Sequence, residues 1–307
     1  MHSKAGRWGA AAAVLLVLQA AAARAAYHVA GHLGEGRLSR IVQLTAAPDD
    51  TLYVLEAGGK VVGFSPDGKE KVRFDTGLLS AAALAVDRER RLYLFSTVTR
   101  KKKVKVRSRL RVKLFPVGVK CVVFSPDGSP QGERSFPTLK SVRTAHFVGN
   151  RLVIADLAAR ALVILDPATG KETARISKGL RLCCGIFDFA PAPADSLIVA
   201  NLGAFKVQRF DLDGKLLEAF GERGRAPAAF HGCCNPVSAA WLPDGRIVTV
   251  EKDPTRVKIY SADRKSVRSI KGIEELVKGC SFIPLAVDSK GTIYLGAAKG
   301  YIVVCKP

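Results

Sequence analysis

The feature that most constrains this chain is a short apolar pattern that recurs six times. Each copy is a run of strand-forming residues preceded by polar turn residues, as in DTLYVLE and NRLVIAD. The intervals between successive copies are 40, 60, 45, 50 and 46 residues. A repeat of this length is typical of chains built from equivalent units, so it decides the fold before any other pattern does. The copies begin their apolar runs at Leu52, Leu92, Leu152, Leu197, Ile247 and Ile293.

Each repeat consists of short β-strands. A second apolar run follows each copy and in most cases ends in turn residues, as in VVGFSPDGK and VQRFDLDGK. A third short run precedes most copies, for example PLAVD. Runs of this kind, with Asp and Gly between them, are typical of hairpin-connected strands. No segment shows convincing helical amphipathicity, so we expect three or four antiparallel strands in each unit.

These repeats predict an all-β fold, a six-bladed β-propeller. A linear β-solenoid is the main structural competitor, but its repeats are usually shorter. The last repeat ends at Pro307 after about three strands. We therefore expect residues 27–36 to supply its outer strand, which would close the ring and remove an open sheet edge. The predicted blades lie near residues 38–76, 78–137, 138–177, 179–221, 230–272 and 279–307.

The best-defined repeat resembles the NHL-repeat family. It reads AFGERGRAPAAFHGCCNPVSAAWLPDGRIVTVEKDPTRVKIYSADRK, residues 219–265, with FG, a Gly-containing linker, F, P, and two apolar runs separated by DG. The resemblance extends over residues 38–307, and GCCNP, TVEK and RVKIY are also similar to segments of exported bacterial NHL-type proteins. It implies an NHL-like propeller. Most NHL propellers bind proteins, peptides, glycans or nucleic acid and few are enzymes, so the resemblance implies binding more than catalysis.

The N-terminus has the pattern of a secretory signal peptide. Lys4 and Arg7 precede an apolar stretch, and Ala23-Arg24-Ala25 fits a small-x-small cleavage site. The stretch is short for a membrane span, although a retained N-terminal anchor is the alternative. We expect a signal peptide over residues 1–25 and a single propeller domain over residues 26–307. This predicts a periplasmic or extracellular location, with no transmembrane span after processing.

The chain is strongly basic. It carries 48 Lys and Arg against 27 Asp and Glu, a formal net charge of +21. The predicted signal peptide contains three cations and no acid, so its removal leaves +18. Such a charge favours anionic partners, and export disfavours nucleic acid among them. We expect a monomer whose partner is a protein, a peptide or an anionic envelope polymer.

Two pairs of adjacent cysteines, Cys183-Cys184 and Cys233-Cys234, occur 50 residues apart. Aligning the last three repeats places Cys234 level with Cys280, ahead of the innermost strand of each blade. These cysteines are therefore expected near one mouth of the central channel. An extended chain would direct Cys184, Cys234 and Cys280 to one side and the other two cysteines to the opposite side.

The aligned cysteines admit two interpretations. A disulfide within one pair is disfavoured because adjacent Cα atoms are only about 3.8 Å apart. Bonds between the pairs would staple neighbouring blades, and an exported protein can keep such bonds. Alternatively, the thiolates form a redox-active pair or hold a soft metal, Cu(I) or Zn(II). The candidate ligands are then Cys183, Cys184, Cys233, Cys234, Cys280 and His231.

A basic insertion accounts for the long interval between the second and third repeats. It reads RKKKVKVRSRLRVKLF, residues 100–115, and every odd position from Lys103 to Lys113 is Lys or Arg. This period of two predicts a projecting β-ribbon with one cationic face and one largely apolar face. The ribbon would either protect a sheet edge from aggregation or bind anions. The candidate anion-binding residues are Lys101, Lys102, Lys103, Lys105, Arg107 and Arg109.

No catalytic constellation stands out in the sequence. It contains no Gly-rich phosphate loop and no HExxH or GxSxG motif. We therefore predict an exported binding or scaffold protein that presents a cysteine-rich channel rim and a basic ribbon. The alternative is a redox or metal-handling periplasmic protein with a thiolate site for Cu or Zn, or a propeller enzyme.

Overall fold

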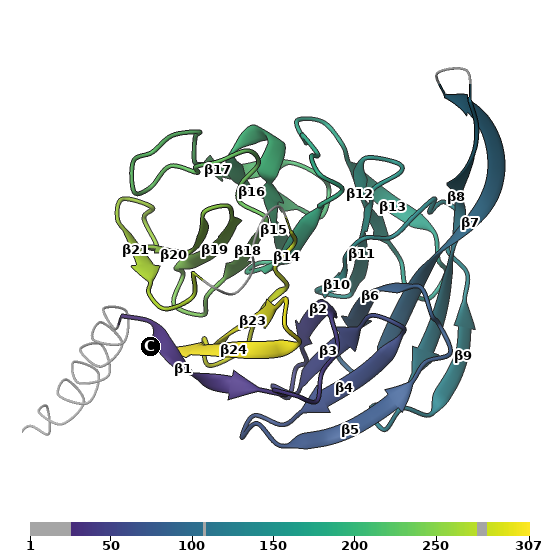
Figure 1. Cartoon of the computed structure of the whole chain (residues 1–307), viewed down its shortest axis with the longest axis horizontal. Helices are drawn as coiled ribbons and strands as arrows, with labels where there is room; N and C mark the ends of the chain where they lie inside the picture. Colours follow the sequence, from purple (N-terminus) through teal and green to yellow (C-terminus); the bar gives the residue numbers. More distant parts are fainter. Residues whose placement is uncertain (1–25, 107–108, 275–280) are drawn as a thin grey trace, which may run out of the picture.

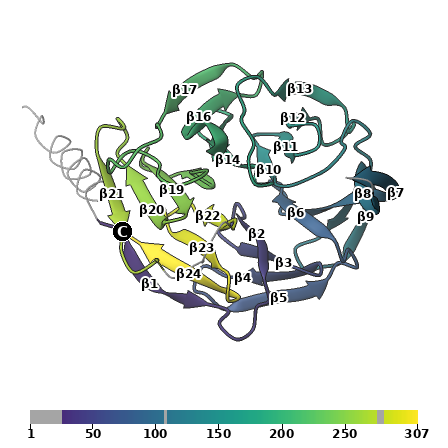
Figure 2. The same cartoon turned by 45° about the horizontal axis from the view of Figure 1, so that its top comes forward.

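Six four-stranded antiparallel sheets surround a central axis in the computed structural model of the protein, which describes residues 26–106, 109–274 and 281–307 (Figure 1). In each of the first five sheets the strands follow one another in sequence order, with the first strand nearest the axis (Figure 2). This arrangement confirms the predicted all-β, six-bladed propeller. The predicted signal peptide, residues 1–25, lies outside the described residues.

The six blades have the following strands. Blade one consists of β2 (Ile41–Ala46), β3 (Leu52–Glu56), β4 (Lys60–Phe64) and β5 (Glu70–Asp75). Blade two consists of β6 (Ala81–Val86), β7 (Leu92–Val106), β8 (Arg109–Phe124) and β9 (Pro130–Arg134). Blade three consists of β10 (Ala145–Val148), β11 (Arg151–Asp156), β12 (Ala161–Leu165) and β13 (Glu172–Ile176). Blade four consists of β14 (Asp188–Ala192), β15 (Ser196–Asn201), β16 (Lys206–Asp211) and β17 (Leu216–Phe220), with a 3-10 turn at Leu202–Ala204. Blade five consists of β18 (Ser238–Trp241), β19 (Ile247–Lys252), β20 (Thr255–Tyr260) and β21 (Val267–Ile270). Blade six consists of β22 (Leu285–Val287), β23 (Ile293–Ala297), β24 (Tyr301–Lys306) and β1 (His28–Leu33).

The repeated apolar positions lie at the first or second residue of the second strand in each blade. In blade one, Leu52 pairs with Ala46 of the inner strand, and β3 is buried along its whole length. Neighbouring blades cover both faces of such a strand, which is why it reads as a continuous apolar run. The core between blades four and five shows this packing, since Ile198 of β15 and Ile247 of β19 belong to one buried cluster.

The N-terminal strand closes the ring. β1 pairs antiparallel with β24, from His28 opposite Lys306 to Leu33 opposite Ile302. Just before β1, the Tyr27 hydroxyl donates a hydrogen bond of 2.7 Å to the carbonyl of Gly291. The prediction that residues 27–36 supply the missing outer strand is therefore confirmed.

One face of the propeller collects the unusual segments of this chain. Because the strands of a blade are antiparallel, the segment that enters the first strand lies on the same face as the turn between the second and third strands. We call this the upper face. It carries both cysteine pairs, which precede β14 and β18, and the extension of β7 and β8. Within the described residues, no helix is long and apolar enough to cross a membrane.

Candidate functional site

A ring of equivalent residues surrounds the upper end of the channel. Three of its polar members form hydrogen bonds with other blades. The Thr144 hydroxyl donates to the carbonyl of Phe187 at 2.8 Å, and the Ser238 hydroxyl donates to the carbonyl of Ile283 at 2.8 Å. The Gln43 amide donates to carbonyls of blades two and three at 2.8 and 3.0 Å. Each blade contributes one residue to this ring. It is the residue that pairs with the second strand at the position three residues after the repeated apolar residue. The six residues are Gln43, Ala83, Thr144, Asp188, Ser238 and Pro284.

Asp188 is the ionisable member of this ring. It begins β14 and is buried between Thr144 and Ser238, its equivalents in the two neighbouring blades. Burial raises the pKa of Asp188 to about 7, although the nearby Ser238, Arg143 and Thr144 side chains act in the opposite direction. A carboxyl group in this position is half protonated near neutral pH.

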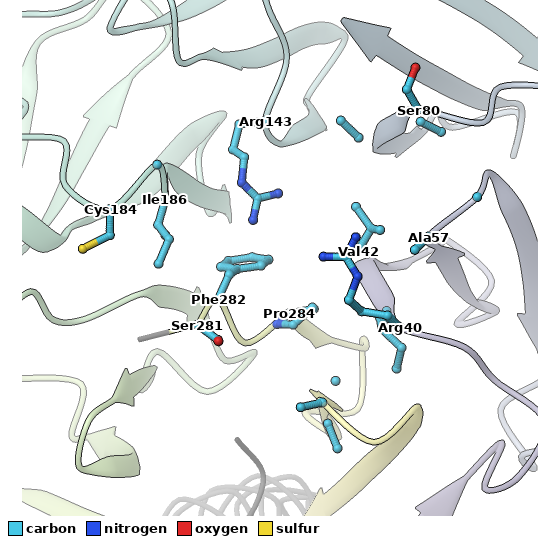
Figure 3. A pocket seen from close by; sticks show the side chains of 18 of the residues that line it. Arg40, Val42, Ala57, Ser80, Arg143, Cys184, Ile186, Ser281, Phe282 and Pro284 are labelled. Carbon is cyan, nitrogen blue, oxygen red and sulfur yellow. The ribbon is translucent and has the colours of Figure 1, made fainter. Parts of the chain in front are cut away.

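A cavity of about 540 Å³ opens at the channel mouth on the upper face, above this ring. Arg40 and Arg143 line it from blades one and three, and their guanidinium groups point into it in Figure 3. The Arg143 guanidinium lies over the Phe282 ring, 4.5 Å from the ring centroid, in a cation–π arrangement. Phe282 forms an aromatic wall of the same cavity.

The cavity is cationic. Among the residues that the structure describes, neither Arg40 nor Arg143 has a carboxylate within ion-pair distance. Burial lowers the pKa of Arg143, and the nearby Asp188 opposes that shift while Arg40 adds to it. An arginine keeps its charge under such a perturbation because its ordinary pKa is above 12. Two guanidinium groups and an aromatic ring suit an anionic group attached to an apolar or planar body.

The cysteines form a cluster beside this cavity. A disulfide joins Cys183, ahead of β14, to Cys234, ahead of β18, with the two Cα atoms 6.6 Å apart. It links blades four and five, as the staple interpretation predicts. The sulfur of Cys184 lies 3.4 Å from that of Cys183, and the sulfur of Cys233 lies 3.6 Å from that of Cys234. Cys184 lines the cavity, but its sulfur points away from the centre in Figure 3.

The predicted grouping of the cysteine side chains is wrong for the described residues. The extended-chain argument placed Cys183 and Cys234 on opposite sides, yet they are bonded. The chain here is not extended, because Cys184 has a φ of 55° and the Ile186 amide closes a tight turn onto the Cys183 carbonyl. Cys280 lies outside the described residues.

Among the described residues, three of the candidate metal ligands have their sulfurs close together. The sulfurs of Cys183, Cys184 and Cys234 lie within 4.8 Å of one another. His231 and Cys233 instead line a different depression, together with Arg223 and Arg225. Three thiolates at this spacing suit a soft ion such as Cu(I), but only when the disulfide is reduced, because a metal-bound sulfur must be a thiolate.

The basic insertion forms the extension of β7 and β8. Lys101, Lys102, Lys103, Lys105 and Arg109 are exposed along it, while Arg107 lies outside the described residues. The predicted division into one cationic and one apolar face is wrong. Lys101 lies opposite Leu114, and Lys105 lies opposite Leu110. Cross-strand partners share a face, so each face combines cations with apolar side chains.

Comparison with known proteins supports the fold. No protein-family model matches the chain, and no curated protein sequence does. Among solved structures, a streptogramin B lyase is similar over 88% of this chain and 94% of its own, at 12% identity and a TM-score of 0.56. Virginiamycin B lyase from Staphylococcus aureus matches at 11% identity and 0.55, over 88% and 95%. The WD40 β-propeller domain of Doa1 matches at 14% identity and 0.53, over 92% and 97%. At these identities the likeness shows the β-propeller fold alone.

Proposed function

We propose that this protein is an exported, NHL-like binding propeller that takes an anionic group of its partner at the channel mouth. The observation that carries the proposal is the convergence of Arg40 and Arg143 on one cavity of about 540 Å³. A volume of this size suits a side chain, a chain terminus or a sugar acid, within the usual range for small-ligand sites. The partner is therefore a protein, a peptide or an anionic envelope polymer that inserts one such group.

The neighbouring chemistry supports an anionic ligand. Guanidinium groups bind carboxylate and phosphate in a bidentate manner, and the Phe282 ring offers a face for an apolar or planar part of the ligand. The buried Asp188 acts against anion binding when it is ionised. Since the pKa of Asp188 is raised to about 7, we expect affinity for an anion to fall as the pH rises through that value.

A location outside the cytoplasm is part of the proposal. The Cys183–Cys234 disulfide supports it, because such bonds persist in oxidising compartments and are rare where thiol reductants are maintained. The sequence pattern of residues 1–25 supports the same location.

The test is calorimetric titration with hippurate, an acylated amino acid carboxylate, and with its neutral counterpart hippuramide. We expect the wild type to bind hippurate and to prefer it over hippuramide. Arg143→Gln and Arg40→Gln should each weaken hippurate binding at least tenfold, a loss of the size seen for a charge-assisted hydrogen bond. Arg88→Gln is the matched control, since Arg88 is an exposed arginine in the β6–β7 turn on the opposite face. Absence of hippurate binding, or equal binding by all three variants, would contradict the proposal.

A soft-metal site is a second candidate function, favoured by the three sulfurs of Cys183, Cys184 and Cys234. Protein reduced with a phosphine and then desalted without oxygen should bind one Cu(I) per chain in competition with a chromophoric chelator. The oxidised protein should bind none. Cys183→Ser should abolish binding, whereas Cys233→Ser, which leaves these three sulfurs unchanged, should retain it. No binding by the reduced wild type would exclude this candidate.

A further inference from the structure

The extension of β7 and β8 is a second feature that needs a partner, and it is independent of the channel mouth. We call its described residues, 99–105 and 109–116, the ribbon. The two strands stay paired far beyond the other strands of blade two, and the ribbon rises from the upper face as the dark teal hairpin in Figure 1. It is therefore a two-stranded sheet with both faces turned to solvent.

One face of the ribbon combines a row of lysines with a row of apolar side chains. Lys101, Lys103 and Lys105 of β7 lie directly opposite Leu114, Val112 and Leu110 of β8. The three apolar residues are 62%, 60% and 74% exposed. On the other face the cations Lys102, Arg111 and Lys113 dominate, with Val104 half-buried between them.

The charge of the ribbon is not neutralised within its own segment. The chain from Thr97 to Val119 contains nine Lys and Arg and no Asp or Glu. The ion pair nearest to it along the chain, Lys120 with Glu133, belongs to the blade. Lysines on an edge protect it from aggregation, but that explanation leaves the exposed row Leu110, Val112 and Leu114 unexplained, because such side chains promote association.

Two classes of anionic surface would attract the ribbon. A soluble polyanion needs only the cations, since its binding depends on neutralising charge. The surface of an anionic bilayer uses both rows, because cationic side chains contact phosphate groups while neighbouring apolar side chains enter the boundary between headgroups and acyl chains. The presence of both rows on one face favours the bilayer.

We propose that the ribbon binds the surface of an anionic phospholipid bilayer. The row Leu110, Val112 and Leu114 enters the headgroup boundary, and Lys101, Lys103 and Lys105 bind lipid phosphates beside it. At about 3.3 Å per residue, the apolar row is about 13 Å long, so it reaches the depth of an interfacial segment and does not span the bilayer. The propeller is then held with its upper face toward the membrane.

The test is co-sedimentation of residues 26–307 with vesicles at about 0.15 M salt, the physiological ionic strength. Vesicles of phosphatidylglycerol and phosphatidylcholine should bind the protein, and vesicles of phosphatidylcholine alone should not. The triple variant L110N/V112T/L114N should lose at least tenfold in binding, because the apolar row is removed. The triple variant K101S/K103S/K105S should lose about a hundredfold, at roughly fivefold for each lysine.

Matched controls change the same residue types elsewhere. Lys171, Lys215 and Lys265 are exposed in the turns between the third and fourth strands of blades three, four and five, on the opposite face. K171S/K215S/K265S should bind vesicles within twofold of the wild type. L216N/L217N, which changes two other exposed leucines, should do the same. Thermal unfolding of every variant checks that the propeller is folded.

Insertion of the apolar row into the bilayer can be measured separately from binding. Tryptophan fluorescence of Val112→Trp should shift to shorter wavelength when anionic vesicles are added, and should not shift when polyphosphate is added. If L110N/V112T/L114N binds vesicles as well as the wild type, or if the fluorescence does not shift, the ribbon is a site for soluble polyanions and the proposal is wrong. Equal binding to both vesicle types would also overturn it.

Discussion

At the scale of single residues, Asp188 predicts a pH dependence of stability. The pKa of its buried carboxyl is raised to about 7, whereas an unfolded Asp titrates near 3.9. Between these values the folded state binds more protons than the unfolded state, so Asp188 makes the protein less stable as the pH rises from about 4 to about 7. Asp188→Asn, which keeps the shape and removes the charge, should raise the free energy of unfolding at pH 8 by up to about 4 kcal/mol. Urea unfolding of both proteins at pH 5 and pH 8 measures this.

The unfolding free energies of the variant and the wild type must be compared because a second titratable group, His146, changes stability with pH in the opposite direction. Burial lowers the pKa of His146 to about 4, so His146 reduces stability as the pH falls below its unfolded value. Both proteins contain His146, and its contribution cancels in the comparison. If Asp188→Asn raises the free energy of unfolding no more at pH 8 than at pH 5, the folded protein ionises Asp188 without losing stability.

The Cys183–Cys234 disulfide predicts a loss of stability that depends on redox state. The bond closes a loop with a sequence separation of 51, and a native bond of this kind contributes about 2–4 kcal/mol. Cys183→Ser should lower the free energy of unfolding by that amount, whereas Cys233→Ser, at an exposed cysteine outside the bond, should change it by less than about 0.5 kcal/mol. In excess dithiothreitol, wild type and Cys183→Ser should unfold at the same urea concentration. If the two proteins still unfold at different urea concentrations in dithiothreitol, the loss of stability in Cys183→Ser comes from packing and not from the disulfide.

The residues of the candidate site were only partly predictable. Repeat alignment was enough to bring Cys183 and Cys234 to one rim, because equivalent positions of neighbouring blades are neighbours in space. It could not say which sulfurs meet, since that depends on the turn at Cys184 with its positive φ. Asp188 and Arg143 match no motif. A signal for Asp188 was nevertheless present, because its equivalents in the neighbouring repeats are the uncharged Thr144 and Ser238.

At the scale of elements, the ribbon shows that a real alternation of charge along the sequence can still predict the wrong side chains for each face of a hairpin. The alternation of cations over residues 103–113 is real, and one continuous strand would separate the two kinds of side chain. The segment instead contributes to two paired antiparallel strands, in which Val106 lies opposite Arg109. Within the ribbon, that register places odd-numbered residues of β7 opposite even-numbered residues of β8. The faces of a hairpin depend on the register of its turn, which a period of two leaves undetermined.

The ribbon should be dispensable for folding. Replacing residues 99–117 with Asn-Gly would join Val98 to Gly118, which are cross-strand partners, by a two-residue hairpin turn. The removed side chains that the structure describes are nearly all exposed, so the free energy of unfolding should change by less than about 1 kcal/mol. Thr97 stays in place because its hydroxyl accepts a hydrogen bond of 3.0 Å from the Val142 amide. A loss above about 3 kcal/mol would mean that the ribbon packs on the blade.

At the scale of the whole molecule, the fold was predictable because the same strand pattern occurs six times in the sequence. Six copies of one strand pattern reinforce one another, and an irregularity in one repeat, such as the 60-residue interval after the second copy, does not change the architecture. The closing strand followed from the same argument, since the last repeat ends one strand short. The cavity at the channel mouth could not be predicted in this way. It is formed by residues such as Arg40, Arg143 and Phe282, which come from three different blades.

Closure of the ring predicts the largest effect on the whole molecule. A chain of residues 37–307 lacks β1 and Tyr27, which exposes the edge of β24 and uncovers the buried side chains of Ile302 and Val304. Compared with residues 26–307, it should lose more than about 3 kcal/mol of unfolding free energy, because a buried aromatic residue and one strand of a blade are removed together. Its open edge should also cause association, seen as concentration-dependent light scattering.

A synthetic peptide of residues 26–36 should restore the monomer, whereas the same peptide with Val29→Pro and His32→Pro should not, because proline cannot donate the hydrogen bonds of the strand. If residues 37–307 unfold at the same urea concentration as residues 26–307, the N-terminal strand does not hold the ring closed.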